Sequence, residues 1–309
     1  MTRLKHFFRE SFRNRALIIM ALPGIILVFM FNYMPMFGIS IAFKSFNYGK
    51  GILGSPWCGL DNFKMLITNM NVTSRIVRNT LGYYFLFTAV GTVANVALAI
   101  ALYECVFKRY AKVTQTIMIM PTFISFIAVT YIVNALLNNA TGMFNNILKS
   151  MGKSPINWYL SPQYWPAILT VVNVWKGTGY GSIMYLSALS GMDQEIFEAA
   201  QIDGATKGQQ IRYITLPMLT GMICILLLLG LGGIMHSNTG LHYQVTKNVG
   251  LLYSTTQTID AFILNALTSG TSNFGMNAAV TFFQSVVGCI MVVVTNLIVR
   301  RWDPDKALF

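Results

Sequence analysis

The stretch Glu198-Ala199-Ala200-Gln201-Ile202-Asp203-Gly204-Ala205, followed by Leu216-Pro217, lies between two long apolar runs. Its polar residues and its glycine predict a helix–turn–helix insert in a chain that is otherwise typical of a membrane protein. A water-exposed segment held between two membrane spans is a suitable contact for a second protein. Segment 190–217 is therefore the first candidate functional site.

The composition supports a membrane protein. The chain has 309 residues, of which 54% are hydrophobic and 10% are charged, whereas a soluble domain usually carries about 25% charged residues. A membrane-spanning helix needs about 20 apolar residues. The length therefore predicts one domain, residues 1–309, that crosses the membrane several times.

Apolar run length predicts an all-α polytopic membrane protein with six transmembrane helices. The first run follows a basic N-terminus and is too long for the core of a signal peptide, so we expect it to remain as a span. The predicted spans are 17–42, 80–102, 113–137, 166–189, 217–235 and 278–299.

The net charge of +12 is unevenly distributed. Because Lys and Arg flank the apolar runs, the charge indicates membrane orientation, and no nucleic acid partner is expected. The denser flanking segments face the cytoplasm by the positive-inside rule, so we expect both termini and the insert to lie inside. These segments are 1–16, 103–112, 190–216 and 300–309.

The insert can be built from local rules. Asp193 is suited to cap a short helix, and Gly204 permits a left-handed turn that ends it. Thr206 and Gln209 have the spacing of a capping box for a second short helix. Pro217 is expected to close the insert and open the fifth span. Taken alone, this pattern equally describes a well-capped linker with no partner.

The motif also carries a family resemblance. Its spacing resembles the EAA loop of permease subunits of type I ABC importers, and segment 57–63 (Trp-Cys-Gly-Leu-Asp-Asn-Phe) resembles a stretch common in sugar permeases. Segments 175–176, 185–189 and 296–309 are similar to the branch that handles oligosaccharides. The resemblance implies these ATPase-coupling residues: Glu198, Ala199, Ala200, Asp203, Gly204, Ala205, Ile211, Leu216 and Pro217.

The resemblance further implies a bacterial plasma-membrane protein that forms half of a sugar-import pore working by alternating access. Its expected partners are a second homologous permease in a heterodimer, two ATP-binding subunits inside and a solute-binding lipoprotein outside. ATP and Mg²⁺ would be bound by the ATPase subunits, so no cofactor is expected here. Two positions depart from the family pattern, since Gly208 stands where many members have an aromatic residue and Ile211 where they have Phe. The docking contacts at these two positions are not predicted.

One charge, Lys176, falls inside a predicted span. Because a central lysine costs about 2.5–3.5 kcal/mol on insertion scales, it should face protein or water. It either lines the translocation cavity or is a structural lysine bound to a carbonyl or a partner. Trp175 and Tyr180 are suited to stack on sugar rings, although such aromatics more often pack against helices. The candidate substrate pathway is Asn173, Trp175, Lys176 and Tyr180.

Other kinds of protein fit less well. The three histidines and four cysteines form no metal-binding pattern, and no metal site or catalytic set is expected. A membrane enzyme should show a catalytic pair. A self-sufficient secondary sugar transporter remains the main alternative, but it usually carries acids within its spans, and Glu104 and Asp260 lie outside them.

Overall fold

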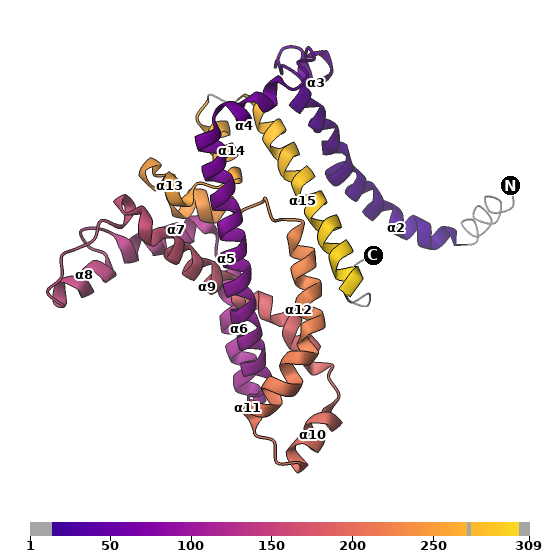
Figure 1. The fold of residues 1–309 in the computed structure, drawn as a ribbon, viewed down its shortest axis with the longest axis vertical. Coiled ribbons are helices and arrows are strands. Elements are labelled where there is room, and N and C mark those ends of the chain that lie inside the picture. The colour runs from indigo at the N-terminus through magenta and orange to yellow at the C-terminus, as the bar shows by residue number, and fades with distance from the viewer. Residues whose placement is uncertain (1–13, 271–272, 303–309) are drawn as a thin grey trace. The chain divides into compact units, whose positions relative to one another are not determined.

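The computed structural model describes residues 14–270 and 273–302 (Figure 1). In this part of the chain the long elements are all helices, and extended residues pair only at an isolated bridge between Lys44 and Trp57. The all-α prediction is confirmed. The helices fall into two compact units, which are described separately.

The first unit contains the N-terminal helix and the beginning of α15 (Phe274–Trp302), up to residue 282. The N-terminal helix changes from α2 (Arg15–Val28) through a π-turn, η1 (Phe29–Tyr33), to a 3₁₀ segment, η2 (Met34–Phe43). Over α2 its apolar side chains are exposed, as expected of a helix that faces lipid or another subunit. The short elements α3 (Gly51–Gly54), η3 (Asp61–Phe63) and α4 (Lys64–Thr68) follow.

Segment 57–63 folds the chain back after the first helix. The Asn62 side-chain amide donates to the Lys44 carbonyl oxygen at 3.0 Å. The Phe43 ring stacks on Trp57 with ring centroids 5.8 Å apart. The stretch that resembles sugar permeases therefore has a structural role in this unit.

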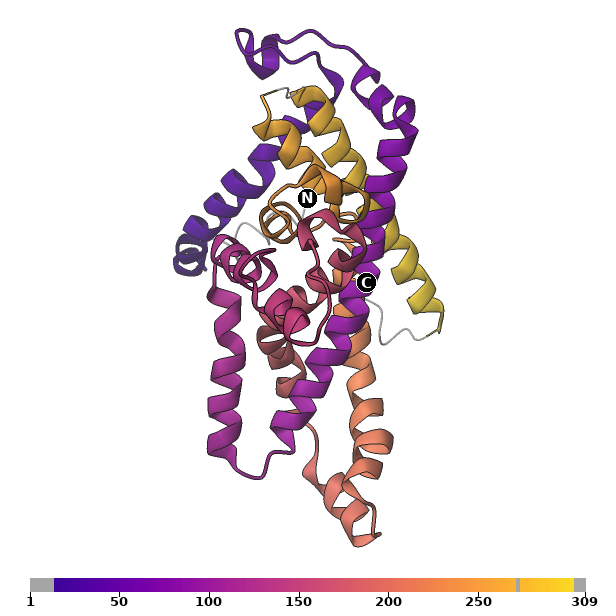
Figure 2. The same ribbon diagram turned by 90° about the vertical axis from the view of Figure 1, so that its left-hand side faces the viewer.

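The second unit is a helix bundle built around α9 (Trp165–Ser190). This helix packs along α5 (Met70–Tyr103) and α6 (Lys108–Phe123), and it also contacts α12 (Leu216–Leu231). Figures 1 and 2 show these helices extending toward the end of the unit that carries the insert. The bundle thus connects that end directly with the apolar core.

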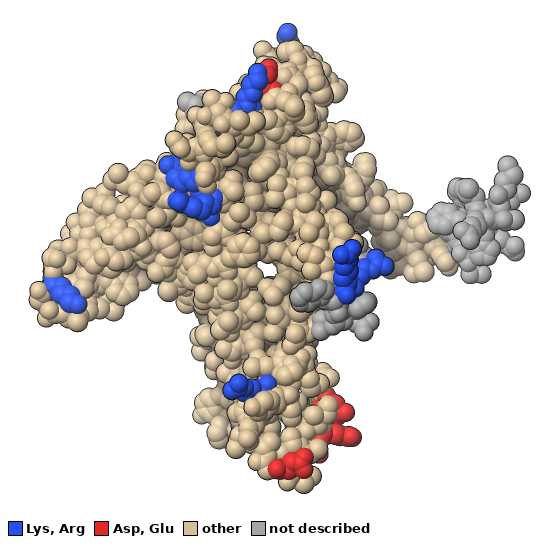
Figure 3. Space-filling model, viewed as in Figure 1, with Lys and Arg blue, Asp and Glu red and all other residues tan. Residues whose placement is uncertain are grey.

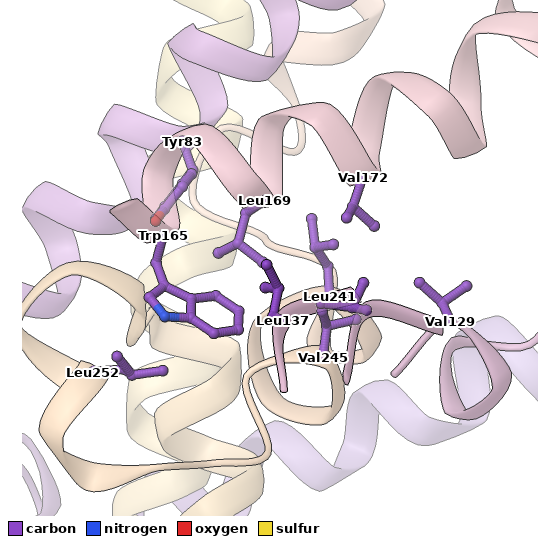
Figure 4. Close-up of a cluster of buried hydrophobic side chains, with 10 residues drawn as sticks. Tyr83, Val129, Leu137, Trp165, Leu169, Val172, Leu241, Val245 and Leu252 are labelled. Carbon is purple, nitrogen blue, oxygen red and sulfur yellow. The ribbon is translucent and has the colours of Figure 1, made fainter. Parts of the chain in front are cut away.

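Two apolar clusters hold this bundle together. The larger forms where α9 meets α7 (Phe126–Leu137) and the π-turn η7 (Gly240–Val245) (Figure 4). The smaller joins α5, α9 and α12. Their fully buried members include Val129, Trp165, Leu169, Val245 and Leu252 in the first, and Ala99, Leu189 and Leu219 in the second.

The predicted span 113–137 is not one straight helix. Helix α6 ends at Phe123, and α7 begins at Phe126 after a bend of 99°. Ser125 caps α7 by accepting a hydrogen bond from the Ala128 N–H at 3.2 Å. Pro121 near the end of α6 lacks an N–H, which weakens the helix before the bend.

The remaining elements of the second unit are short. Asn145, fully buried, organises the loop after α7, since its side-chain oxygen accepts from the Ile156 N–H at 3.0 Å and the Trp158 indole N–H at 3.2 Å. These elements are α8 (Met143–Ser150), η4 (Trp158–Leu160), η5 (Pro162–Tyr164), η8 (Gly250–Leu252), α13 (Tyr253–Thr256) and α14 (Ile259–Thr268).

Among the described residues, four helices are long and apolar enough to cross a membrane, or five if α6 and α7 count as one broken span. Helix α9 covers the predicted span 166–189 but is not among these helices, because it carries polar residues such as Asn173 and Lys176. The six-span count and the orientation with both termini inside stay predictions.

Candidate functional site

The first half of the insert folds as its local sequence predicts. Asp193 caps α10 (Gln194–Ile202) by accepting a hydrogen bond from the Glu195 N–H at 3.0 Å. Gly204 follows with φ +81°, and the Ala205 N–H donates back to the Ala200 carbonyl oxygen at 2.9 Å. The predicted cap and the predicted left-handed turn are both confirmed.

The second half begins as predicted and then departs from the prediction. Thr206 and Gln209 form the capping box at the start of α11 (Lys207–Gln210). The helix does not stop at Pro217, however, but continues through the π-turn η6 (Ile211–Thr215) into α12. The Leu216 N–H donates to the Ile211 carbonyl oxygen, so wider turns accommodate the proline, which has no N–H. Pro217 therefore stands in the first turn of α12, as predicted, but it does not close the insert, because the helix runs on from Lys207.

The predicted coupling residues lie at the surface of this insert. Glu198, Ala199, Asp203 and Gly204 are exposed, and Ala200 and Ala205 are partly buried. Figure 3 shows acidic side chains gathered at this end of the molecule. Phe197 is the buried anchor of α10, with 5% exposure. The other predicted coupling residues, Ile211, Leu216 and Pro217, are partly buried or exposed on the continuous helix.

Replacing Gly204 with valine should destabilise the insert. A β-branched residue in the left-handed region raises the free energy of the folded state by about 1–2 kcal/mol. We therefore expect a lower melting temperature for the purified variant. The control is Gly208→Ala, because a Cβ at Gly208 meets no atom within 4 Å and alanine favours a helix. A melting temperature unchanged by Gly204→Val would contradict this account of the turn.

A polar cavity of about 200 Å³ lies between α5 and α9. Asn95 and Asn173 line it from opposite helices, together with Thr178. Among the described residues, the Asn95 side-chain oxygen and the Thr178 hydroxyl are buried without a hydrogen-bond partner. Unpaired amide and hydroxyl groups in a cavity suit a ligand that offers hydroxyl groups. The other lining residues are Phe87, Thr88, Gly91, Thr92, Val174 and Gly177.

The structure does not gather the four predicted pathway residues into one site. Asn173 lines the cavity described above, whereas Trp175 and Tyr180 are 43% and 63% exposed at the surface of the chain. The residues on the α5 side of the cavity were not predicted from the sequence. Thr88, Thr92 and Asn95 recur at helical spacing within a predicted span. This polar face was the signal in the sequence that could have indicated the cavity.

Lys176, on α9, extends its ammonium group to the bend between α6 and α7. Its ammonium group donates to the carbonyl oxygens of Pro121 (2.9 Å) and Thr122 (2.8 Å) and to that of Ile124. It also lies 5.0 Å from the centroid of the Phe126 ring. These contacts favour the structural alternative, in which the lysine binds carbonyl groups at the end of the broken helix.

Asp260, at the first turn of α14, organises a polar cluster that sequence analysis did not single out. Its carboxylate accepts hydrogen bonds from the Ser237 N–H at 2.6 Å and from the Gln284 amide at 3.3 Å, and it pairs with His236 at 3.5 Å. The cluster joins the segment that follows α12 to α14 and α15. Its signal in the sequence was an acid two residues after Thr258, which occupies the N-cap position of α14.

The pKa values in this cluster predict a pH dependence. Pairing with Asp260 raises the pKa of His236 above its ordinary 6.5. Burial alone would raise the pKa of Asp260, but hydrogen bonds from His236, Ser237 and Gln284 bring it below 3.8. His242 nearby stays neutral, because burial lowers its pKa to about 4. The stabilisation by Asp260 is lost as pH falls through its lowered pKa, and that by His236 is lost as pH rises through its raised pKa.

We therefore expect the purified protein to melt at a higher temperature at pH 6 than at pH 8, by about 1–2 °C because His236 is half exposed. The His236→Gln variant should lose this difference, which differential scanning fluorimetry measures. An equal difference in the wild type and the variant would assign the pH dependence to another group.

Within residues 14–270 and 273–302, no group of three or more His, Cys, Asp or Glu residues is arranged to hold a metal ion. The candidate site therefore consists of an exposed insert, a polar cavity between α5 and α9, and the helices that join them. These features define a multi-pass membrane protein whose exposed insert continues directly into a long helix of the bundle.

Comparisons with known proteins agree with this class. Residues 106–304 match the family "Binding-protein-dependent transport system inner membrane component". The polygalacturonan/rhamnogalacturonan transport system permease protein YteP of Bacillus subtilis (strain 168) is 30% identical over 305 residues, which cover 97% of this chain and 92% of YteP.

Two solved structures are similar as well. The first, of a bacterial ABC transporter involved in the import of the acidic polysaccharide alginate, has a TM-score of 0.85 and 31% identity and covers 96% of this chain and 99% of the matched chain. The second, of a bacterial alginate ABC transporter in complex with an alginate pentasaccharide-bound periplasmic protein, has a TM-score of 0.84 and 31% identity, with coverages of 95% and 97%. The chain belongs to the family of binding-protein-dependent transport system inner membrane components.

Proposed function

We propose that the chain is the membrane-spanning subunit of an ATP-driven importer of oligosaccharides that contain uronic acids. The observation that carries this proposal is the exposed insert, which is rigidly capped and continues without a break into the 25-residue helix Lys207–Leu231. A protein that pushes on α10 therefore moves a helix of the bundle. Support for the substrate comes from the relatives, whose names specify polygalacturonan, rhamnogalacturonan and alginate.

The chain would form half of the pore, with a second permease as the other half. Two ATP-binding subunits would dock on the insert from inside, and a solute-binding lipoprotein would deliver the oligosaccharide from outside. These ATPases would bind ATP and Mg²⁺, and this chain would carry out no bond chemistry. ATP-driven closure of the ATPases would switch the bundle from inward-open to outward-open.

The polar cavity between α5 and α9 is the proposed substrate pathway. Asn95, Asn173 and Thr178 supply amide and hydroxyl groups from two facing helices. Such groups can exchange hydrogen bonds with sugar hydroxyls, while the aromatic ring of Phe87 offers an apolar face. Trp175 and Tyr180 are exposed on this chain and would contribute where the second permease completes the pore.

The test is transport by the complete assembly. The chain is co-expressed with a candidate second permease and ATPase subunits and is reconstituted in vesicles with a candidate binding protein. Uptake of labelled trigalacturonate, an alginate trisaccharide and neutral maltotriose is then measured. We expect the vesicles to take up an acidic trisaccharide. This uptake should require ATP and should continue in the presence of an uncoupler.

Uptake that an uncoupler abolishes while ATP is maintained would support a secondary transporter instead. Transport of maltotriose alone would refute the acidic substrate but not the importer. As a check on the docking surface, a photocrosslinker at Ala200 should capture an ATPase subunit in transporting membranes. Failure to capture one there would overturn the proposed role of the insert.

A further inference from the structure

We propose that an ion pair between Glu104 and Lys207 transmits movement of the insert to α5 and α6. This inference rests on the proposed function, in which ATPases act on α10. The insert is joined covalently only to α9 and α12. Helices α5 and α6 form a separate hairpin, which can respond to the insert through direct contacts with it as well as through packing along α9.

The pair lies where the α5–α6 turn meets the insert. Glu104 follows the last residue of α5, Lys207 begins α11, and the Lys207 ammonium lies 2.9 Å from the Glu104 carboxylate. The Glu104 side chain is 21% exposed and that of Lys207 is 63% exposed. Figure 2 shows the turn and the insert at the same end of the unit.

Each residue occupies an unfavourable position without its partner. An acidic side chain at the C-terminal end of a helix is repelled by the helix dipole, and so is a basic one at an N-terminal end. Glu104 stands at the C-terminal end of the 34-residue α5, and Lys207 begins the continuous helix Lys207–Leu231. The pair turns both positions into attractive ones, because each charge then faces the opposite charge and the opposite end of a helix.

A second polar contact runs beside the first. The Gln194 amide, at the start of α10, donates to the Tyr103 hydroxyl at 2.6 Å. Between the two contacts lies a cavity of about 410 Å³, lined by Phe197 and Gln201 from α10 and by Cys105 from the turn. The two polar contacts span this hollow part of the junction and help to hold the insert against the hairpin beside the buried Phe197.

The pair should therefore affect coupling more than stability. An ion pair with one partner well exposed contributes little to the stability of a resting structure. It nevertheless fixes the distance between α11 and the end of α5 during a movement. We infer that Glu104 and Lys207 are positioning residues that make α5 and α6 move with the insert.

The test measures uptake per ATP hydrolysed in the reconstituted assembly, with trigalacturonate, the alginate trisaccharide and maltotriose as probes. Glu104→Lys and Lys207→Glu should each lower this ratio about tenfold, a typical size for coupling between sites. The exchange variant carrying both substitutions should recover to within about threefold of the wild type. Lys112→Glu is the matched control, since it reverses an exposed charge on α6 and should stay within about twofold.

The remaining outcomes are decisive as well. Full coupling in both single variants would overturn the inference and leave the proposed function standing. If the single variants lose the assembled complex on gel filtration in proportion to the lost uptake, the pair has a purely structural role. That result would also overturn the inference. A wild-type assembly with no ATP-driven uptake of any probe would refute the proposed function, and the inference would fall with it.

Discussion

Replacing Gly179 with valine is expected to separate α6 from α9 and to prevent accumulation of folded protein. Gly179 is buried on α9, and a Cβ there would lie 1.8 Å from the Met118 carbonyl oxygen and 2.2 Å from its carbon. Both obstructing atoms belong to the backbone of α6, so no side-chain rotation relieves the clash. Overpacking of this kind costs about 3 kcal/mol or more, because whole helices must move apart.

The measurement is the amount of folded protein in membranes and its melting temperature after extraction. Gly177→Ala is the matched control, because a Cβ two residues earlier on the same helix meets no atom within 4 Å. We also expect Gly179→Ala to lower the melting temperature. A wild-type melting temperature for Gly179→Ala would show that α6 and α9 are not in backbone contact.

The contact at Gly179 illustrates what the sequence alone does not contain. Gly177 and Gly181 have the small-xxx-small spacing that permits close approach of helices, but of the glycines at 177, 179 and 181 only Gly179 meets the backbone of α6. Gly181 instead faces the side chain of Asn95 on α5. A small residue indicates that an approach is possible, whereas the partner helix and the depth of contact depend on the packing of distant segments.

The insert was predictable because its structure is local. The cap at Asp193, the turn at Gly204 and the capping box at Thr206 each depend on atoms within about five residues. The same local rules correctly predicted Pro217 in the first turn of α12, but they did not predict that the helix before it would run on into α12. Whether a proline starts a helix or is absorbed by a π-turn is decided by the turns on both sides, which in this chain are held in one helix from Lys207 to Leu231.

The break between α6 and α7 was not predictable, for a different reason. Residues 113–137 form a continuous apolar run with one proline, and prolines are tolerated inside membrane helices. The group that satisfies the broken helix is Lys176, more than 50 residues away in the chain. Sequence analysis could state that this lysine needs protein or water around it, but not which carbonyl groups it would bind.

Replacing Lys176 with methionine should therefore destabilise the folded chain even though it makes α9 more apolar. Removing a central lysine favours membrane insertion by about 2.5–3.5 kcal/mol. It also leaves the carbonyl oxygens of Thr122 and Ile124 without this donor, and unsatisfied buried groups cost about 1–3 kcal/mol each. The Pro121 carbonyl oxygen keeps its hydrogen bond from the Ile124 N–H. The two effects act at different stages, since insertion precedes the packing of α6 and α7 against α9.

We accordingly expect Lys176→Met to insert normally but to melt at a clearly lower temperature, with uptake reduced in proportion to the folded protein that remains. Protease accessibility of the membranes, fluorimetry of the extracted protein and uptake per folded molecule measure these three quantities. Trp175→Leu, a change at the neighbouring exposed position, is the control for melting. Unchanged melting with a selective loss of acidic oligosaccharide uptake would instead place the lysine in the translocation cavity, because a charge that meets a substrate carboxylate is not needed to hold the bend.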